Sequence, residues 1–382
     1  MMRKTSGKES LEPVLLGERK LAGVLADALL ADAEVNRWTH GFHTYPAGLH
    51  PDGAALLVEA FPGGSMLDPF CGGGTTLIEG MAAGFRCVGR DISPVAVRVA
   101  KSRTALVDDA RLTRFRSRAR KMTEIARQAG DRPPSDIYGA VEQWYAPHAI
   151  LELESLRTGI QESPEEIRPL LETAFSSILV KTSWRQSDTS TRRVKHRRPK
   201  GTTAILFHKK TRELARRLVA LREAVPESTN RPDIRFSDAR SLSIGPPVDL
   251  ILTSPPYPST YDYLPMQHLR SIWFGDHAKR GERHEIGARR DWRDGSRGAK
   301  KRWVEATTAW TKSAAACLSS GGHLVIVIGD GLMPSGTVDT SAPTEHAARA
   351  AGLKSVARAS IERVDHARDS RRWEHIFAFV KP

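Results

Sequence analysis

A strand, a glycine-rich turn, a helix and a second strand follow one another between residues 65 and 91, and this order constrains the fold more than any other feature. The pattern predicts a strand over 65–68, a turn over 72–74, a helix over 75–83 and a strand over 85–90. Two strands joined by a helix in this way run parallel. The segment therefore predicts an α/β protein with a mostly parallel sheet and helices on both faces.

The turn itself is suited to bring its backbone close to a ligand. Gly72 and Gly74 have no side chain that would keep a ligand away, and the helix that follows begins with free N–H groups. Asp68 and Asp91 stand at the ends of the two strands, and an acid after the second strand suits hydrogen bonds from ribose hydroxyls. The pattern differs from the Gly-x-Gly-x-x-Gly dinucleotide fingerprint, so it indicates another kind of nucleotide site.

A second segment, about 180 residues later, ends a predicted strand in a rigid aromatic turn, Ser254-Pro255-Pro256-Tyr257. The prolines fix φ and remove N–H donors, so the backbone carbonyls of the turn are left as acceptors. Ser254 adds a hydroxyl acceptor and Tyr257 a flat face for stacking. Such a turn suits recognition of an amino group on a planar ring, although the same residues alone could form a purely structural turn.

Together and in this order, the two segments resemble the cofactor loop and the catalytic loop of S-adenosylmethionine-dependent DNA amino-methyltransferases. The resemblance covers roughly 36–104 and 231–382. It implies a Rossmann-like class I methyltransferase fold with a seven-stranded sheet, and S-adenosylmethionine as the cofactor. The residues that it places around the cofactor are Tyr45, Pro46, Asp68, Phe70, Gly72, Gly74, Thr75, Asp91, Ile92 and Asp238.

The resemblance also implies the reaction, which is direct methyl transfer to the exocyclic amino group of a base flipped out of double-stranded DNA. Its catalytic residues are Ser254, Pro255, Pro256 and Tyr257. Serine at the first position resembles the cytosine-N4 group, whereas adenine-N6 enzymes more often carry Asp or Asn there. We therefore expect cytosine-N4 methylation, with adenine-N6 methylation, RNA base methylation and a binding protein without catalysis as alternatives. None of the three cysteines follows a proline, which argues against the carbon-5 cytosine mechanism.

The charge of the chain indicates a polyanionic partner. Its 58 Lys and Arg outnumber its 44 Asp and Glu, giving a net charge of +14, and phosphate neutralisation by such residues drives nucleic-acid binding. Much of this excess lies in a basic stretch over 181–217, for which a solvated charged face is the alternative interpretation. The residues expected to contact nucleic acid are Arg185, Arg192, Arg193, Lys195, Arg197, Arg198, Lys200 and Tyr261.

The rest of the chain supports a division into four parts. We expect an N-terminal helical extension (1–35), a first core part (36–104), a helical, basic insertion for target recognition (105–230) and a second core part (231–382). Further elements are expected as a helix over 11–31 and strands over 234–237, 248–253, 324–329 and 375–380.

The remaining expectations concern metals, membranes and partners. The three cysteines form no CxxC pair, so no metal site is expected. The longest strongly apolar runs are strand-length, too short to span a bilayer, and we expect a cytoplasmic protein. A cognate restriction nuclease is a further partner that the resemblance allows, and the sequence does not define the oligomeric state.

Overall fold

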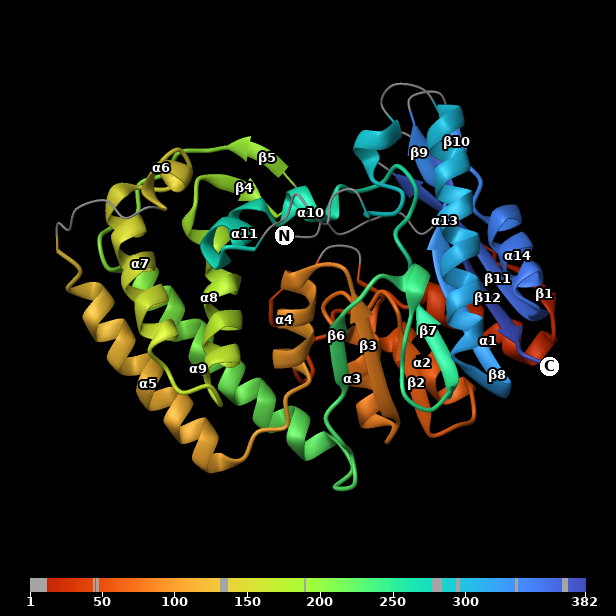
Figure 1. Ribbon diagram of the computed structural model, residues 1–382, viewed down its shortest axis with the longest axis horizontal. Helices are drawn as coiled ribbons and strands as arrows, with labels where there is room; N and C mark the ends of the chain where they lie inside the picture. The colour runs from red at the N-terminus through yellow and green to blue at the C-terminus, as the bar shows by residue number, and fades with distance from the viewer. Residues whose placement is uncertain are drawn as a thin grey trace.

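The computed structural model describes residues 12–43, 45, 48–130, 137–188, 190–276, 284–292, 296–333, 336–365 and 370–382. A large sheet forms the centre of one half of the molecule, and a group of helices forms the other half (Figure 1). The strands of the sheet are β1 (Val14–Gly17), β2 (Ser65–Asp68), β3 (Arg86–Asp91), β6 (Asp233–Phe236), β7 (Val248–Thr253), β8 (Leu318–Gly329), β11 (Lys354–Asp365) and β12 (Ser370–Val380).

The strand order is β1-β11-β12-β8-β7-β2-β3-β6. From β8 to β6 all neighbours are parallel, whereas β12 runs antiparallel between β8 and β11. The chain leaves β2 toward β3 on one side and returns to β7 on the other, so the strand order reverses beside β2, where open α/β sheets bind ligands. The predicted Rossmann-like methyltransferase fold is confirmed, with β1 added as an eighth strand at the edge.

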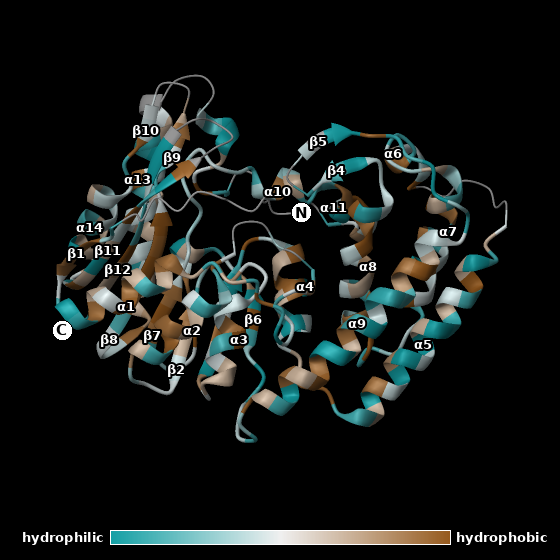
Figure 2. Cartoon of the chain, turned by 180° about the vertical axis from the view of Figure 1, so that it is seen from behind, coloured by the Kyte–Doolittle hydropathy of each residue, from teal (hydrophilic) through white to brown (hydrophobic). Residues whose placement is uncertain are grey.

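Helices cover both faces of the sheet. One face packs against α1 (Arg19–Leu30), α2 (Pro51–Ala60) and α3 (Thr75–Ala82), and the other packs against α13 (Ser296–Ala316) and α14 (Ser341–Ala350). In β7, Leu250 and Leu252 face the first layer while Val248 and Ile251 face the second. Because both faces are buried, the central strands are continuous apolar runs, which Figure 2 shows as brown arrows.

The helical half consists of α5 (Asp109–Arg127), α6 (Tyr138–Val141), α7 (Pro147–Gln161), α8 (Arg168–Thr182) and α9 (Thr202–Ala224), with a hairpin of β4 (Arg185–Ser187) and β5 (Ser190–Arg193). It has its own apolar core. The predicted helical character of 105–230 is confirmed, but the hairpin was not predicted. Phe42, and Trp273 from α11 (His268–Phe274), complete this core, so its packing crosses the predicted domain boundaries, which stay a prediction.

The N-terminal element differs from the prediction of one helix over 11–31. Residues 14–17 form β1, and α1 begins at Arg19. Glu18 caps this helix, because its carboxylate accepts hydrogen bonds from Lys20 N and Leu21 N. The leucines have helical spacing, but residues 14–17 pair with β11 as a strand. The prediction of a helix was wrong for these residues.

Three strands were missed in the C-terminal part, namely β9 (Gly331–Met333), β10 (Gly336–Val338) and β11. Charged residues such as Arg358 and Glu362 alternate with apolar residues along β11, so the sequence shows no continuous apolar run that would have predicted this strand. The predicted strands over 324–329 and 375–380 exist, but they begin earlier, at Leu318 and Ser370. No helix within the described ranges is both long and apolar enough to cross a membrane.

Candidate active site between two loops

The two predicted loops meet at the carboxyl edge of the sheet because β2 and β7 are neighbours. Leu67 pairs with Ile251, so Asp68 and Thr253 end their strands side by side. Thr253 Oγ1 donates a hydrogen bond of 2.7 Å to Asp68 Oδ1. Segments about 180 residues apart in sequence therefore share one hydrogen bond at the base of the site.

Asp68 holds both loops in place. Its buried carboxylate also accepts hydrogen bonds from Phe70 N (3.0 Å) and Thr76 Oγ1 (2.5 Å). Burial raises the pKa of Asp68 to about 6, although these hydrogen bonds oppose the rise. The resemblance placed Asp68 at the cofactor, and Asp68 does line the cavity described below, but its three hydrogen bonds all come from the protein itself.

Asp91 orients the glycine turn and keeps acceptor capacity for a ligand. Its Oδ2 accepts from Gly72 N (2.9 Å) and its Oδ1 from Ser93 N (2.8 Å). A carboxylate has about four lone-pair positions, so two acceptor positions of Asp91 remain for the predicted ribose contact. Burial raises the pKa of Asp91 to about 6.

The backbone of the glycine turn needs residues without side chains. Gly72 has φ +48° and Gly74 has φ +81°, in the left-handed region that favours glycine. A Cβ on Gly72 would lie 3.3 Å from the Tyr45 ring. The ring of Tyr45 thus lies against the turn, as the resemblance implied for the segment around residue 45.

Arg103, at the end of α4 (Pro94–Arg103), joins the glycine turn to the segment that carries Tyr45. Its buried guanidinium donates hydrogen bonds to the carbonyls of Gly73 (2.7 Å), Thr39 (3.1 Å) and His40 (3.2 Å). Burial lowers the pKa of Arg103 to about 10. Sequence analysis missed this residue because an arginine in the last turn of a helix is ordinarily a solvated cation.

These elements enclose a space that we call the glycine-loop cavity. It holds about 920 Å³ outside protein atoms, a volume that includes open solvent at its mouth. The predicted cofactor residues that line it are Tyr45, Asp68, Phe70, Gly72, Thr75, Asp91, Ile92 and Asp238. Gly74 does not line it, and Pro46 lies outside the described residues.

Asp238 lines this cavity with its carboxylate already paired. It begins the short helix η1 (Ala239–Ser241) and accepts a hydrogen bond from Arg240 N. Its two oxygens also accept from Arg240 Nε (2.9 Å) and Nη2 (2.6 Å). An adenine amino group would therefore share this carboxylate with Arg240.

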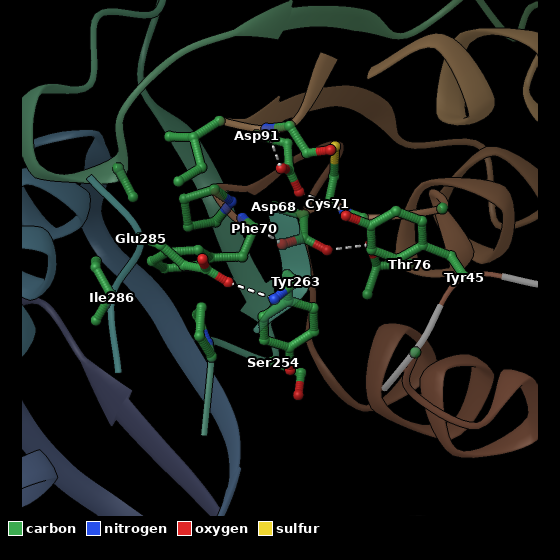
Figure 3. Close-up of a pocket in the computed structure, with 18 of the residues that line it drawn as sticks. Tyr45, Asp68, Phe70, Cys71, Thr76, Asp91, Ser254, Tyr263, Glu285 and Ile286 are labelled. Carbon is green, nitrogen blue, oxygen red and sulfur yellow. Dashed lines mark hydrogen bonds between the residues drawn. The ribbon is translucent and has the colours of Figure 1, made fainter. Parts of the chain in front are cut away.

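Glu285 borders the same cavity and was not predicted. Its Oε1 accepts from the backbone N–H groups of Tyr263 and Leu264, and its Oε2 lies 2.7 Å from Arg290 Nη1. Burial raises the pKa of Glu285. Figure 3 shows Glu285 bonded to Tyr263 opposite the glycine turn. The polar stretch around residue 285 carries no strand or motif that could have marked it.

The turn Ser254–Tyr257 stands between the glycine-loop cavity and a second one, which we call the tyrosine cavity. The tyrosine cavity is lined by Ala28, Leu29, Ala31, Gly48, Leu49, His50, Ser254, Tyr257, Thr260, Tyr261, Val327, Arg363, Arg372, Glu374 and Ile376. Ser254, Gly48 and Leu49 line both cavities. Pro256 lines the glycine-loop cavity, whereas Pro255 is buried and lines neither.

Tyr257 is fixed in the wall of the tyrosine cavity. Its hydroxyl donates to Glu374 Oε1 (3.1 Å), and Glu374 Oε2 accepts from Arg363 Nε (2.9 Å). A Cβ at Gly329 would lie only 2.7 Å from Tyr257 Cε2, so the ring fits because residue 329 is glycine. The aromatic face is thus held in one orientation beside Ser254.

Among the predicted nucleic-acid contacts, Arg185 is placed differently from the expectation. It is buried, and its guanidinium donates to the carbonyls of Ser190, Met266 and Asp188 at 2.7 to 3.1 Å. This side chain stabilises the β4–β5 hairpin and does not face solvent. Because the N–H groups of this guanidinium are bonded to carbonyls of the protein, the structure does not support a contact between Arg185 and nucleic acid.

The other predicted contacts are accessible. Tyr261 lines the tyrosine cavity, Arg198 is half-buried, and the exposed residues are Arg192, Arg193, Lys195, Arg197 and Lys200. Lys195 Nζ lies 5.1 Å from the centre of the Trp184 ring. Their contact with nucleic acid stays a prediction. The part of the chain that the structure describes contains no group of three His, Cys, Asp or Glu arranged to hold a metal ion.

Comparison with known proteins supports the resemblance. The chain is 29% identical over 150 residues to the type II methyltransferase M.MvaI of Kocuria varians, covering 36% of this chain and 33% of that protein. It is 33% identical over 119 residues to the type II methyltransferase M.MjaII of Methanocaldococcus jannaschii, covering 29% of this chain and 22% of that protein. The predicted resemblance to methyltransferases is confirmed, and it spans a third or less of each of these relatives.

No family model matches the chain. Among solved structures, TrmN from Thermus thermophilus aligns with a TM-score of 0.34 at 13% identity, covering 87% of this chain and 48% of that one. The rRNA methyltransferase aviRa from Streptomyces viridochromogenes aligns with a TM-score of 0.32 at 15% identity, covering 94% of both chains. At such scores the strand order itself remains the basis for the fold.

Proposed function

We propose that this protein transfers a methyl group from S-adenosylmethionine to the exocyclic amino group of a flipped-out base in DNA, and that the base is cytosine, methylated at N4. The observation that carries the proposal is the position of Ser254 in the wall between two cavities. A methyl donor on one side and an acceptor nitrogen on the other would meet at this residue.

The residues of the glycine-loop cavity fit the cofactor. Gly72 and Gly73 leave backbone exposed against Tyr45, where a Cβ would crowd the space. Asp91 offers acceptors for ribose hydroxyls, and Phe70 and Ile92 offer apolar surface for a purine ring. When bound, S-adenosylmethionine would supply an electrophilic methyl group on a sulfonium centre.

The turn Ser254–Tyr257 would prepare the amino group for attack. The lone pair of an exocyclic amine is delocalised into its ring, which makes the nitrogen a poor nucleophile. Acceptors from Ser254 and the proline carbonyls would bind both amino hydrogens and direct the lone pair toward the glycine-loop cavity. The Tyr257 ring, held by Glu374 and Gly329, would stack on the base.

DNA as the substrate is supported by charge and by the two type II methyltransferases. The net charge is +14, and exposed basic residues follow the β4–β5 hairpin. The choice of cytosine rests on serine at position 254.

The test incubates the protein with genomic DNA and S-adenosylmethionine carrying a labelled methyl group, then identifies labelled nucleosides by mass spectrometry. N4-methylcytosine is the expected product. N6-methyladenine would overturn the base assignment and keep the reaction class, and label found only in RNA in a parallel incubation would overturn DNA as substrate. A Ser254→Ala variant that binds S-adenosylmethionine normally but transfers no methyl group is the matched control for label introduced by a contaminating enzyme.

A further inference from the structure

The tyrosine cavity is lined by two arginines, and only one of them is paired within the part of the chain that the structure describes. Arg363 and Arg372 stand directly opposite each other on β11 and β12, and both line the cavity. Glu374 pairs with Arg363 at 2.9 Å. Within the described part of the chain, Arg372 has no hydrogen-bond or ion-pair partner.

Two like charges directly opposite on a strand pair are destabilising. One carboxylate for two guanidinium groups leaves the cavity with an excess positive charge. A ligand that offers hydrogen-bond acceptors near Arg372 would offset this cost. Arg372 is therefore positioned for a ligand and is not explained by the stability of the hairpin.

Arg372 lies in the same cavity wall as Glu374, the residue that binds Tyr257. Arg372, Glu374 and Ile376 alternate along β12 toward one face of the sheet, and all three line the cavity. Tyr257 binds Glu374, which is two residues from Arg372, or about 7 Å along a strand. Acceptors at Ser254 and a fork of donors at Arg372 thus border one cavity, whose lining also includes Leu29, Leu49 and Val327.

This arrangement matches the edge of cytosine. Along that edge cytosine presents an amino group, then the ring nitrogen N3 and then the carbonyl O2, which are one donor group followed by two acceptors. Adenine presents its amino group and the acceptor N1, but a C–H bond follows. A guanidinium has N–H donors in a fixed fork and no acceptor, so it can engage two adjacent acceptors at once.

We infer that Arg372 is the specificity-determining residue of the tyrosine cavity, and that it selects cytosine by donating hydrogen bonds to N3 and O2 of the flipped base. This inference rests on the proposed function. Arg363 has a different task, because its hydrogen bonds to Glu374 and to the carbonyl of Leu29 fix the wall that holds Tyr257.

The experiment combines a variant with a base analogue, once the methylated sequence has been mapped. Duplexes carry either cytosine or 3-deazacytosine at the target position; the analogue keeps the amino group and O2 but has C–H in place of N3. Methylation of each duplex is measured as kcat/KM for the natural protein, Arg372→Ala and Arg372→Gln. Arg371→Ala is the matched control, because Arg371 is exposed on the same strand and pairs with Glu362 at 3.0 Å.

We expect Arg372→Ala to lower kcat/KM on cytosine by about 10- to 100-fold, the range of one bidentate base contact. On 3-deazacytosine the same substitution should cost much less, because the contact to N3 is already missing. Arg372→Gln should fall between the natural protein and Arg372→Ala, and Arg371→Ala should behave as the natural protein. Calorimetric titration with S-adenosylmethionine should give unchanged affinity for every variant, which reports an intact fold.

Equal losses on both duplexes would overturn the inference, because they would mean that Arg372 binds the backbone of DNA or supports the hairpin. An Arg372→Ala variant with full activity on cytosine would overturn it as well. In either case the natural protein would still methylate cytosine, and the proposed function would stand. If the natural protein methylates adenine, both the base assignment and this inference fail.

Discussion

Replacing Asp68 separates two properties of one carboxylate, its charge and its capacity to accept hydrogen bonds. Asp68→Ala would leave the N–H of Phe70 and the hydroxyls of Thr76 and Thr253 without their acceptor. An orphaned buried donor costs about 1–3 kcal/mol. Because hydroxyls can turn to other acceptors, we expect a total loss of about 3–5 kcal/mol in the free energy of unfolding at pH 4.5, where the folded protein holds Asp68 largely protonated.

Asp68→Asn should behave in the opposite way. The amide oxygen can accept from Phe70 and Thr253, and the amide nitrogen can donate to the Thr76 hydroxyl, which is able to accept. The substitution also removes a buried charge. The pKa of Asp68 is raised from 3.8 to about 6, and two units of pKa correspond to about 3 kcal/mol.

The direction of the pH dependence of stability follows from the linkage between proton binding and folding. The folded protein binds this proton more tightly than the unfolded chain does, so ionisation of Asp68 opposes folding. The penalty is absent below the unfolded pKa of 3.8, grows as the pH rises toward the folded pKa of about 6 and is complete above it. Asp68→Asn should thus match the natural protein near pH 4 and exceed it by up to about 3 kcal/mol at pH 7.5.

Urea unfolding at pH 4.5, 6 and 7.5 measures these differences. Asp91 also has a pKa raised to about 6, so the natural protein contains both contributions, and the difference from Asp68→Asn isolates Asp68. A difference that stays constant with pH would refute the reasoning. So would an Asp68→Asn variant that is as unstable as Asp68→Ala at pH 7.5, because the hydrogen bonds would then outweigh the buried charge.

Three further predictions concern function. Asp91→Ala should weaken binding of S-adenosylmethionine by about 10- to 100-fold in calorimetry, the effect of losing hydrogen bonds to a charged group; an unchanged affinity would exclude the ribose contact. Tyr257→Ala should abolish most methyl transfer with cofactor affinity retained, whereas Tyr257→Phe keeps the stacking face and should lose only the hydroxyl contact to Glu374; equal activity of the two variants would contradict stacking. Changing Arg192 and Arg197 together to Gln should flatten the log–log salt dependence of duplex binding by about 0.9 per lost phosphate contact, and a slope equal to that of the natural protein would place the DNA elsewhere.

The sequence predicted those parts of the fold that local chemistry dictates. The strand, glycine turn, helix and strand between residues 65 and 91 appear in the structure within a residue or two of their predicted bounds. Ser93 caps α4 and Pro94 is its first residue, two positions that favour serine and proline for local reasons. The local pattern gave a wrong secondary structure in two places. Polar residues interrupt the apolar pattern of β11, and the leucines of β1 fit both a helix and a strand. In both segments, pairing with a neighbouring strand determined the structure.

Two motifs and their order were thus enough to indicate the fold and the proposed chemistry, because backbone geometry at Gly72 and at the two prolines depends on the residues themselves. Only the tertiary structure showed that Arg103 joins the glycine turn to the segment of Tyr45, that Glu374 holds Tyr257, and that Arg372 has no partner among the described residues. These contacts join residues far apart in the chain. The sequence does not distinguish a charged side chain that is solvated from one that is buried and bonded to carbonyls or one that lines a cavity. The surrounding fold determines which of these environments the side chain has.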